Sequence, residues 1–145
     1  MHVVIAEKLW IGNARDGRDV ELLFANRIQT VVDLAIEESA AQLPRELNYF
    51  RVPLLDGGGN DPASLRIAII VVAAHLFGGV RQLVCCGAGL SRSPAVTSFA
   101  MAQWNDKLPN ECLQELRSCK PVDVSPALWN DLEQVAHPTN WRMLR

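Results

Sequence analysis

The amino-acid sequence predicts an α/β fold, with a central and mainly parallel sheet of about four or five strands flanked by helices. Short runs rich in β-branched residues alternate along the chain with longer runs in which apolar residues recur every three or four positions. Strands that alternate with helices in this way are typical of a parallel sheet covered on its faces.

The predicted strands lie at residues 3–5, 31–34, 49–53 and 83–85, and residues 9–11 are expected to add an edge strand. Apolar stripes over residues 19–26 and 65–76 predict helices, the second ending at Gly78 and Gly79.

Three further helix starts are marked by a capping residue followed by proline, which the first turn of a helix tolerates well. These capping residues are Asp61, Ser93 and Ser125. The last third of the sequence is therefore predicted to form three consecutive helices, over residues 93–104, 110–119 and 125–137.

The composition is that of an ordinary globular chain: 145 residues, 49% hydrophobic and 21% charged, expected to form one domain over residues 1–145. The net charge of −2 provides no general basic field, so neither nucleic acid nor a membrane is an expected partner. The longest apolar run, residues 67–74, is far shorter than the roughly 20 residues that cross a bilayer. The N-terminus does not resemble a secretory signal, so a cytoplasmic location is expected.

The four cysteines include the adjacent pair Cys85 and Cys86, and they contain no Cys-x-x-Cys pair. A reducing compartment argues against a disulfide framework, and no metal site is expected. The reactivity of these cysteines is therefore their main interest.

The segment VCCGAGLSRSPAV, residues 84–96, predicts an anion-binding loop between a strand over residues 80–85 and the following helix. Backbone N–H groups of the glycine-rich turn converge there with the helix N-terminus, and such a concave set of donors binds anions. Arg92 stands six positions after Cys86, where its guanidinium can form two parallel hydrogen bonds with a phosphate. The predicted phosphate-binding residues are Gly87, Ala88, Gly89, Leu90, Ser91 and Arg92.

Cys86 is the predicted nucleophile. A thiol beneath converging N–H groups and near an arginine is stabilised as a thiolate, with a pKa below the free value of about 8.5. A thiolate can attack phosphorus and form a phosphocysteine. Cys85 is expected to point away into the packing of the sheet, because side chains alternate along a strand.

The segment from Cys86 to Ser93 has the form Cys-x5-Arg-Ser. It resembles the active-site loop of the cysteine-dependent protein tyrosine phosphatases, and most closely that of the dual-specificity phosphatases. The resemblance extends, in the order found in the family, to residues 9–13, 28–34, 52–56, 120–122 and 125–126. It covers most of the chain and implies a dual-specificity phosphatase-like fold.

The resemblance implies a two-step hydrolysis of phosphomonoesters without a metal or organic cofactor. Cys86 takes the phosphoryl group while an acid protonates the leaving oxygen, and the same acidic residue then activates water to hydrolyse the phosphocysteine. Arg92 and the amides of residues 87–92 stabilise the equatorial oxygens. The Ser93 hydroxyl assists departure of the thiolate in the second step, beside its expected role as a helix cap.

Two carboxylates are candidates for the acid. Asp56, 30 positions before Cys86, falls about where the family's acid lies, whereas Asp61, 25 positions before, is expected to cap a helix. The glycines at 57–59 are expected to leave the Asp56 loop free to move over a bound substrate. Asp56 is therefore the predicted acid and base, against the alternatives of Asp61 as the acid and of Asp56 as a solvated turn residue.

The sequence departs from the family at Cys85, where most members carry histidine. In the family this histidine supports the loop and helps to lower the pKa of the nucleophile, so the Cys86 thiolate is expected to form at a higher pH than in relatives. A second hypothesis makes Cys85 a resolving thiol for oxidised Cys86, although a disulfide between neighbouring residues is strained.

The loop side chains Ala88, Leu90 and Ser91 carry no charge. They favour a phosphorylated protein or a small phosphomonoester over a highly phosphorylated inositide. The oligomeric state is left open, and a monomer is compatible with the sequence.

Two other classes of function stay open. One is a catalytically weak domain that binds phosphorylated partners, and the other is a rhodanese-like sulfurtransferase in which Cys86 carries a persulfide. The retained Asp56, Cys86 and Arg92 argue against the first. The Arg-Ser-Pro helix start and the family-like C-terminal half argue against the second.

Overall fold

The computed structural model describes residues 1–136, and its centre is a five-stranded sheet with the order β1-β2-β5-β3-β4. The strands are β1 (His2–Ile5), β2 (Leu9–Asn13), β3 (Thr30–Ala35), β4 (Asn48–Leu54) and β5 (Gln82–Cys86). Only the β1–β2 pair is antiparallel, while β2–β5, β5–β3 and β3–β4 are parallel. The predicted fold class is confirmed.

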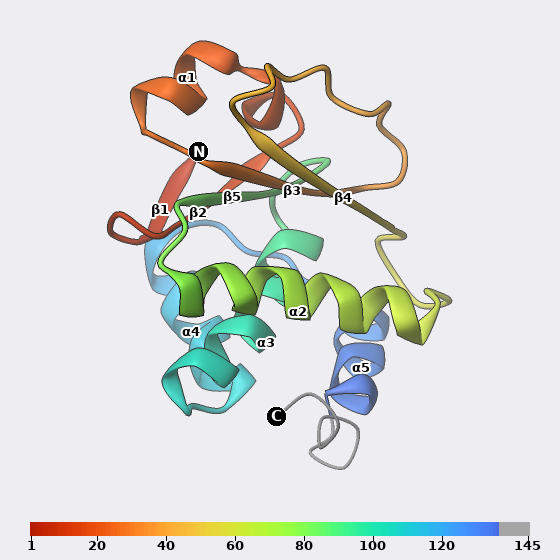
Figure 1. Cartoon of the computed structure of the whole chain (residues 1–145). Helices are drawn as coiled ribbons and strands as arrows, with labels where there is room; N and C mark the ends of the chain where they lie inside the picture. Colours follow the sequence, from red (N-terminus) through yellow and green to blue (C-terminus); the bar gives the residue numbers. More distant parts are fainter. Residues whose placement is uncertain (137–145) are drawn as a thin grey trace.

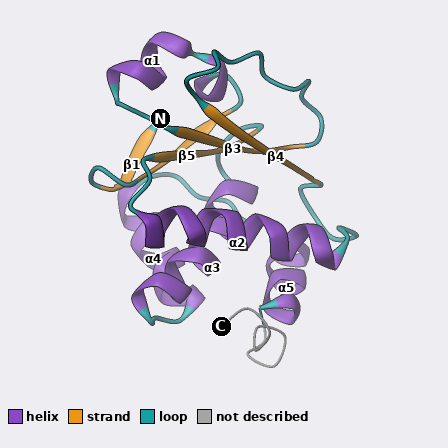
Figure 2. Ribbon diagram, viewed as in Figure 1, coloured by secondary structure: helices purple, strands orange, loops and turns teal. Residues whose placement is uncertain are grey.

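Helices cover both faces of the sheet (Figure 1). The short helices η1 (Asp16–Arg18) and α1 (Val20–Ala25) lie on one face. The other face carries α2 (Pro62–Gly78), α3 (Arg92–Asn105), α4 (Pro109–Cys119) and α5 (Pro126–Val135), and Figure 2 shows these two helical layers on either side of the strands. Within residues 1–136, no helix has the length and apolar character needed to cross a membrane.

The sheet separates two hydrophobic cores. The larger core joins the sheet to α2, α3, α4 and α5 and contains Val84, Cys86, Ile69, Phe99, Leu116 and Leu128. The smaller core lies under α1 and contains Trp10, Leu23, Val31, Leu83 and Cys85. Because side chains alternate along β5, the adjacent cysteines belong to different cores.

The predicted helix caps at Asp61 and Ser125 are confirmed. The Asp61 carboxylate accepts from the Ala63 amide at 3.0 Å, and the Ser125 hydroxyl accepts from the Leu128 amide at 3.4 Å. Each satisfies an amide that has no partner inside its helix.

The predicted cap at Ser93 is wrong. Helix α3 begins at Arg92, Ser91 occupies the N-cap position, and Ser93 is the second helical residue. Proline is accommodated at any position of the first turn, where amides have no intrahelical acceptor, so Pro94 did not fix the start. The predicted end of the last helix at His137, and Trp141, expected in the core or at its rim, lie outside the described residues.

The carboxyl ends of β3, β4 and β5 meet at one edge of the sheet because the three strands are parallel. The chain leaves these ends in three connections, which carry Glu37, Asp56 and the loop after Cys86. In an open parallel sheet this edge is where ligands bind.

Replacing Gly17 with alanine should destabilise the fold, because the new Cβ would lie 2.6 Å from the Cys85 sulfur. Overpacking of this kind costs about 1–3 kcal/mol, measurable as a lower free energy of unfolding in denaturant. The Gly78→Ala control, where the nearest atom is 3.7 Å away, should change stability little. If overpacking is the cause, the added substitution Cys85→Ala should recover part of the loss, and a strictly additive double variant would contradict this explanation.

Candidate active site

The loop over residues 87–91 connects the end of β5 to the start of α3. Cys86 is the last residue of β5 and is buried, with 2% of its surface exposed. Arg92 is the first residue of α3, and it is buried, as is every residue of this helix from Arg92 to Ala102. The structure therefore brings the predicted nucleophile and the predicted phosphate-binding arginine to opposite ends of one short loop.

Neighbouring elements hold the loop from outside. The carbonyl oxygens of Gly87, Gly89 and Leu90 accept hydrogen bonds from the Ala14 amide at 3.2 Å, the Lys120 ammonium at 2.7 Å and the Asp123 amide at 2.8 Å. The Ser91 hydroxyl accepts from the Ser125 amide at 3.0 Å. These bonds occupy carbonyl groups and leave the N–H groups of the loop to another partner.

The loop amides are available for an anion. Among residues 1–136, no amide of residues 88–91 donates a hydrogen bond to another protein group. The turn depends on Gly89, which has φ +75° and approaches β2 so closely that a Cβ would lie 2.8 Å from the Gly12 carbonyl oxygen. Free amides next to a helix N-terminus form an anion-binding concavity.

The two cysteines have different environments. Cys85 is fully buried in the smaller core, and burial, followed by the charge of the neighbouring Asp33 carboxylate, strongly raises the pKa of its thiol. Cys86 lies on the other face of the sheet, at the loop. The expectation that Cys85 points away from the loop is confirmed, and a bond between the two sulfurs would require β5 to rearrange.

Arg92 forms a two-fold ion pair that the sequence did not reveal. Its Nη1 and Nη2 atoms donate to the Glu37 carboxylate at 2.6 and 2.5 Å, and Nη1 also donates to the Leu54 carbonyl at 2.9 Å. This pairing raises the pKa of Arg92 and lowers that of Glu37. The Arg92 Nε is buried without a partner among the described residues, so one edge of the guanidinium is held by Glu37 and its Nε–H remains for a ligand.

The Ser93 side chain is fully buried, and within residues 1–136 its hydroxyl has no hydrogen-bond partner. A buried hydroxyl without a partner costs free energy and calls for an explanation in the chemistry of the site. Because Ser93 does not cap the helix, its hydroxyl is not occupied by the role that the sequence predicted for it.

Asp56 lies in the exposed connection between β4 and α2, and its carboxylate forms no hydrogen bond or ion pair with the described residues. Its charge acts on Arg92 and adds to the rise in the pKa of that guanidinium. Asp56 is thus close enough to the loop to interact electrostatically, whereas Asp61 is engaged as a helix cap.

The loop that carries Asp56 is tied more firmly than its glycines predict. The Asn60 side chain accepts from the Leu55 amide at 2.7 Å and donates to the carbonyls of Leu55 and Gly57 at 3.0 and 3.2 Å. A Cβ added at Gly58 would lie 3.5 Å from Ala127 of α5, so the loop also rests on that helix. The Asn60 side chain therefore bridges the backbone at the two ends of this loop and limits its movement.

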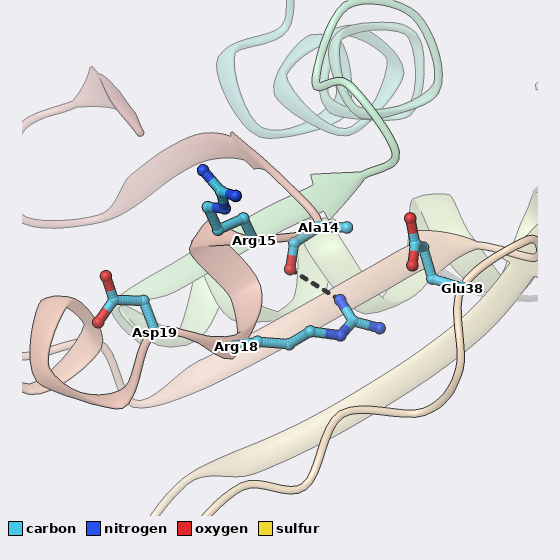
Figure 3. Close-up of a pocket in the computed structure, with 5 residues that line it drawn as sticks. All are labelled: Ala14, Arg15, Arg18, Asp19 and Glu38. Carbon is cyan, nitrogen blue, oxygen red and sulfur yellow. Dashed lines mark hydrogen bonds between the residues drawn. The ribbon is translucent and has the colours of Figure 1, made fainter.

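A separate pocket lies at η1, next to the loop over residues 87–91 (Figure 3). It is lined by Ala14, Arg15, Arg18, Asp19 and Glu38, and Arg18 donates to the Ala14 carbonyl at 2.8 Å. The two basic and two acidic side chains give the lining of this pocket no net charge. Neither Cys86 nor Arg92 lines this pocket.

Known proteins similar to this chain are dual-specificity phosphatases, although no family model matches it. Human dual specificity protein phosphatase 15 is 28% identical over 134 residues, 87% of this chain and 43% of that protein. Mouse dual specificity phosphatase 28 is 27% identical over 132 residues, 90% and 80% of the two chains. Dual specificity protein phosphatase 22 of Xenopus tropicalis is 31% identical over 121 residues, 79% and 56% of the two chains. The chain thus spans about half the length of two of these relatives.

Solved structures agree in fold. Human DUSP28 matches with a TM-score of 0.82 at 23% identity over 96% of this chain and 97% of that one. DUSP15 matches with a TM-score of 0.79 at 21% identity over 99% and 91%. The fold is that of the dual-specificity phosphatases, a group of the cysteine-dependent protein tyrosine phosphatases. The sequence is similar to members of this group over most of the chain.

Replacing Glu37 with glutamine should remove an acid-sensitive contribution to stability. Arg92 lowers the pKa of Glu37 below its ordinary 4.5, so the ionised carboxylate stabilises the fold above that pH, and this stability is lost as the pH falls through the lowered pKa. Wild type should therefore be more stable than Glu37→Gln near pH 7, and the difference should shrink as the pH falls below 4.5.

Denaturant unfolding over this pH range measures the difference. The matched control is Glu38→Gln, at the adjacent half-buried carboxylate, which forms no ion pair within residues 1–136. A stability difference between wild type and Glu37→Gln that does not change with pH would show that the ion pair is not its source.

Proposed function

We propose that this protein is a phosphatase that hydrolyses phosphomonoesters through a phosphocysteine on Cys86. The supporting observation is the loop that follows Cys86 at the end of β5, whose amides at residues 88–91, like the Nε of Arg92, have no partner among the described residues. A phosphate bound there would have its oxygens on these donors and its phosphorus facing the thiolate.

In the first step the Cys86 thiolate attacks phosphorus, and the bond from phosphorus to the ester oxygen breaks. The leaving oxygen takes a proton from Asp56, which stands on an adjacent connection at the same edge of the sheet. The loop amides and Arg92 stabilise the charge that spreads over the equatorial oxygens.

In the second step the Asp56 carboxylate accepts a proton from water, and the water oxygen attacks phosphorus as the sulfur–phosphorus bond breaks. The departing thiolate can accept a hydrogen bond from Ser93, whose hydroxyl has no other partner among the described residues. This assignment gives the buried hydroxyl a function that the fold does not provide.

The proposed substrates are phosphorylated tyrosine, serine and threonine residues of proteins, with small phosphomonoesters as simpler alternatives. At the loop, Leu90 is 39% exposed and presents an apolar side chain. Ala88, Leu90 and Ser91 add no positive charge that would favour a multiply phosphorylated ligand.

Hydrolysis of 4-nitrophenyl phosphate by purified variants tests the assignment. Cys86→Ser should lose nearly all activity, and Asp56→Asn should lose about 10²–10⁴-fold, the usual contribution of an acid–base group. Asp61→Asn is the matched control and should change activity little.

Equal rates for wild type and Cys86→Ser would refute the phosphocysteine, and phosphate binding without turnover would instead favour a binding module. Sulfur transfer from thiosulfate would favour the rhodanese-like alternative.

Replacing Asn60 with alanine should weaken general acid catalysis, because Asn60 holds the loop that carries Asp56. The rate should fall about tenfold for phenyl phosphate, whose leaving oxygen needs a proton, and much less for 2,4-dinitrophenyl phosphate, which leaves without one. Asn110→Ala, on the exposed start of α4, serves as the control. An equal loss for both substrates would mean that Asn60 only supports the fold.

A further inference from the structure

A buried ammonium group lies on the outer side of the phosphate loop. Lys120 follows α4 directly and has only 7% of its surface exposed. Its Nζ donates to the carbonyls of Gly89 and Pro121, both at 2.7 Å. The end of α4 packs against the loop and buries this lysine.

The charge of Lys120 has no carboxylate partner among residues 1–136. A buried charge without a counterion is costly, even where carbonyl groups accept its protons. Burial lowers the pKa of Lys120, and the charge that opposes this effect comes from Cys86. When Cys86 is ionised, its sulfur is thus an anion that interacts with the Lys120 ammonium.

Besides Lys120, the groups near Cys86 are one further cation, Arg92, and two residues that supply no positive charge, Cys85 and Asp56. On β5, Cys85 stays protonated because burial raises the pKa of its thiol. On α3, Arg92 also interacts with the charge of Cys86, but this guanidinium is shared with Glu37 of the β3–β4 connection. On the β4–α2 connection, Asp56 supplies no positive charge.

We propose that Lys120 is a positioning residue that stabilises the Cys86 thiolate from behind the loop and supplies the positive charge that the neutral Cys85 does not. The inference rests on Cys86 being the nucleophile of the proposed function. Lys120 acts through two routes that can be separated: its hydrogen bond fixes the Gly89 carbonyl, and its charge favours the ionised sulfur.

The rate of alkylation of Cys86 by iodoacetamide, measured against pH, reports the ionised sulfur without requiring phosphatase turnover. The exposed Cys119 is first replaced by serine, and modification of Cys86 is followed by peptide mass spectrometry. The variants are Lys120→Met, Lys120→Gln, which keeps a donor but no charge, and Lys120→Arg, which keeps the charge. Lys107→Met, at an exposed lysine paired with Glu115, is the control.

Lys120→Met and Lys120→Gln should raise the pH of half-maximal alkylation by about one unit, the effect expected for loss of one nearby opposite charge. Lys120→Arg and Lys107→Met should stay near wild type. An unchanged profile in folded Lys120→Gln would overturn the proposal, and a shift in Lys120→Met alone would assign the effect to the loop hydrogen bond. Wild type that alkylates at low pH but hydrolyses no phosphate ester would instead count against the proposed function.

Discussion

The outward direction of the loop carbonyls is the constraint on which the candidate site depends. A short loop has as many carbonyls as amides, and the amides can face an anion only if the carbonyls find donors elsewhere. Here those donors come from the segment after β2 and from the segment between α4 and α5. The loop is therefore shaped by parts of the chain distant in sequence, which explains why the site requires nearly the whole fold.

The buried guanidinium of Arg92 imposes the second constraint. A planar guanidinium has more donors than one phosphate can use, and each donor left buried without a partner carries a cost. Glu37 and the Leu54 carbonyl accept hydrogen bonds from Nη1, and Glu37 accepts one from Nη2, which fixes the plane of the guanidinium. Within residues 1–136, Nε has no partner. One carboxylate thus orients the arginine without filling its ligand-binding edge.

The sequence predicted correctly those features that are set by residues close together in the chain. The alternation of strands and helices, the caps at Asp61 and Ser125 and the spacing from Cys86 to Arg92 all depend on residues close together in the chain. The pairs Glu37–Arg92 and Lys120–Gly89 join residues 55 and 31 positions apart, so no local pattern could predict them. The start of α3 was misplaced for a different reason: proline fits any position of the first turn, so Pro94 alone could not fix where the helix begins.

Position 85 shows how the fold limits the chemistry beside the nucleophile. The Cys85 side chain fills a space closed by η1, where Gly17 has no room even for a Cβ, so a larger ring would require a different packing of this face. Burial and the adjacent Asp33 carboxylate keep its thiol protonated, and the sheet separates it from the loop. Any positive charge that helps Cys86 must therefore come from the opposite face of the sheet, where α3 and the end of α4 meet the loop.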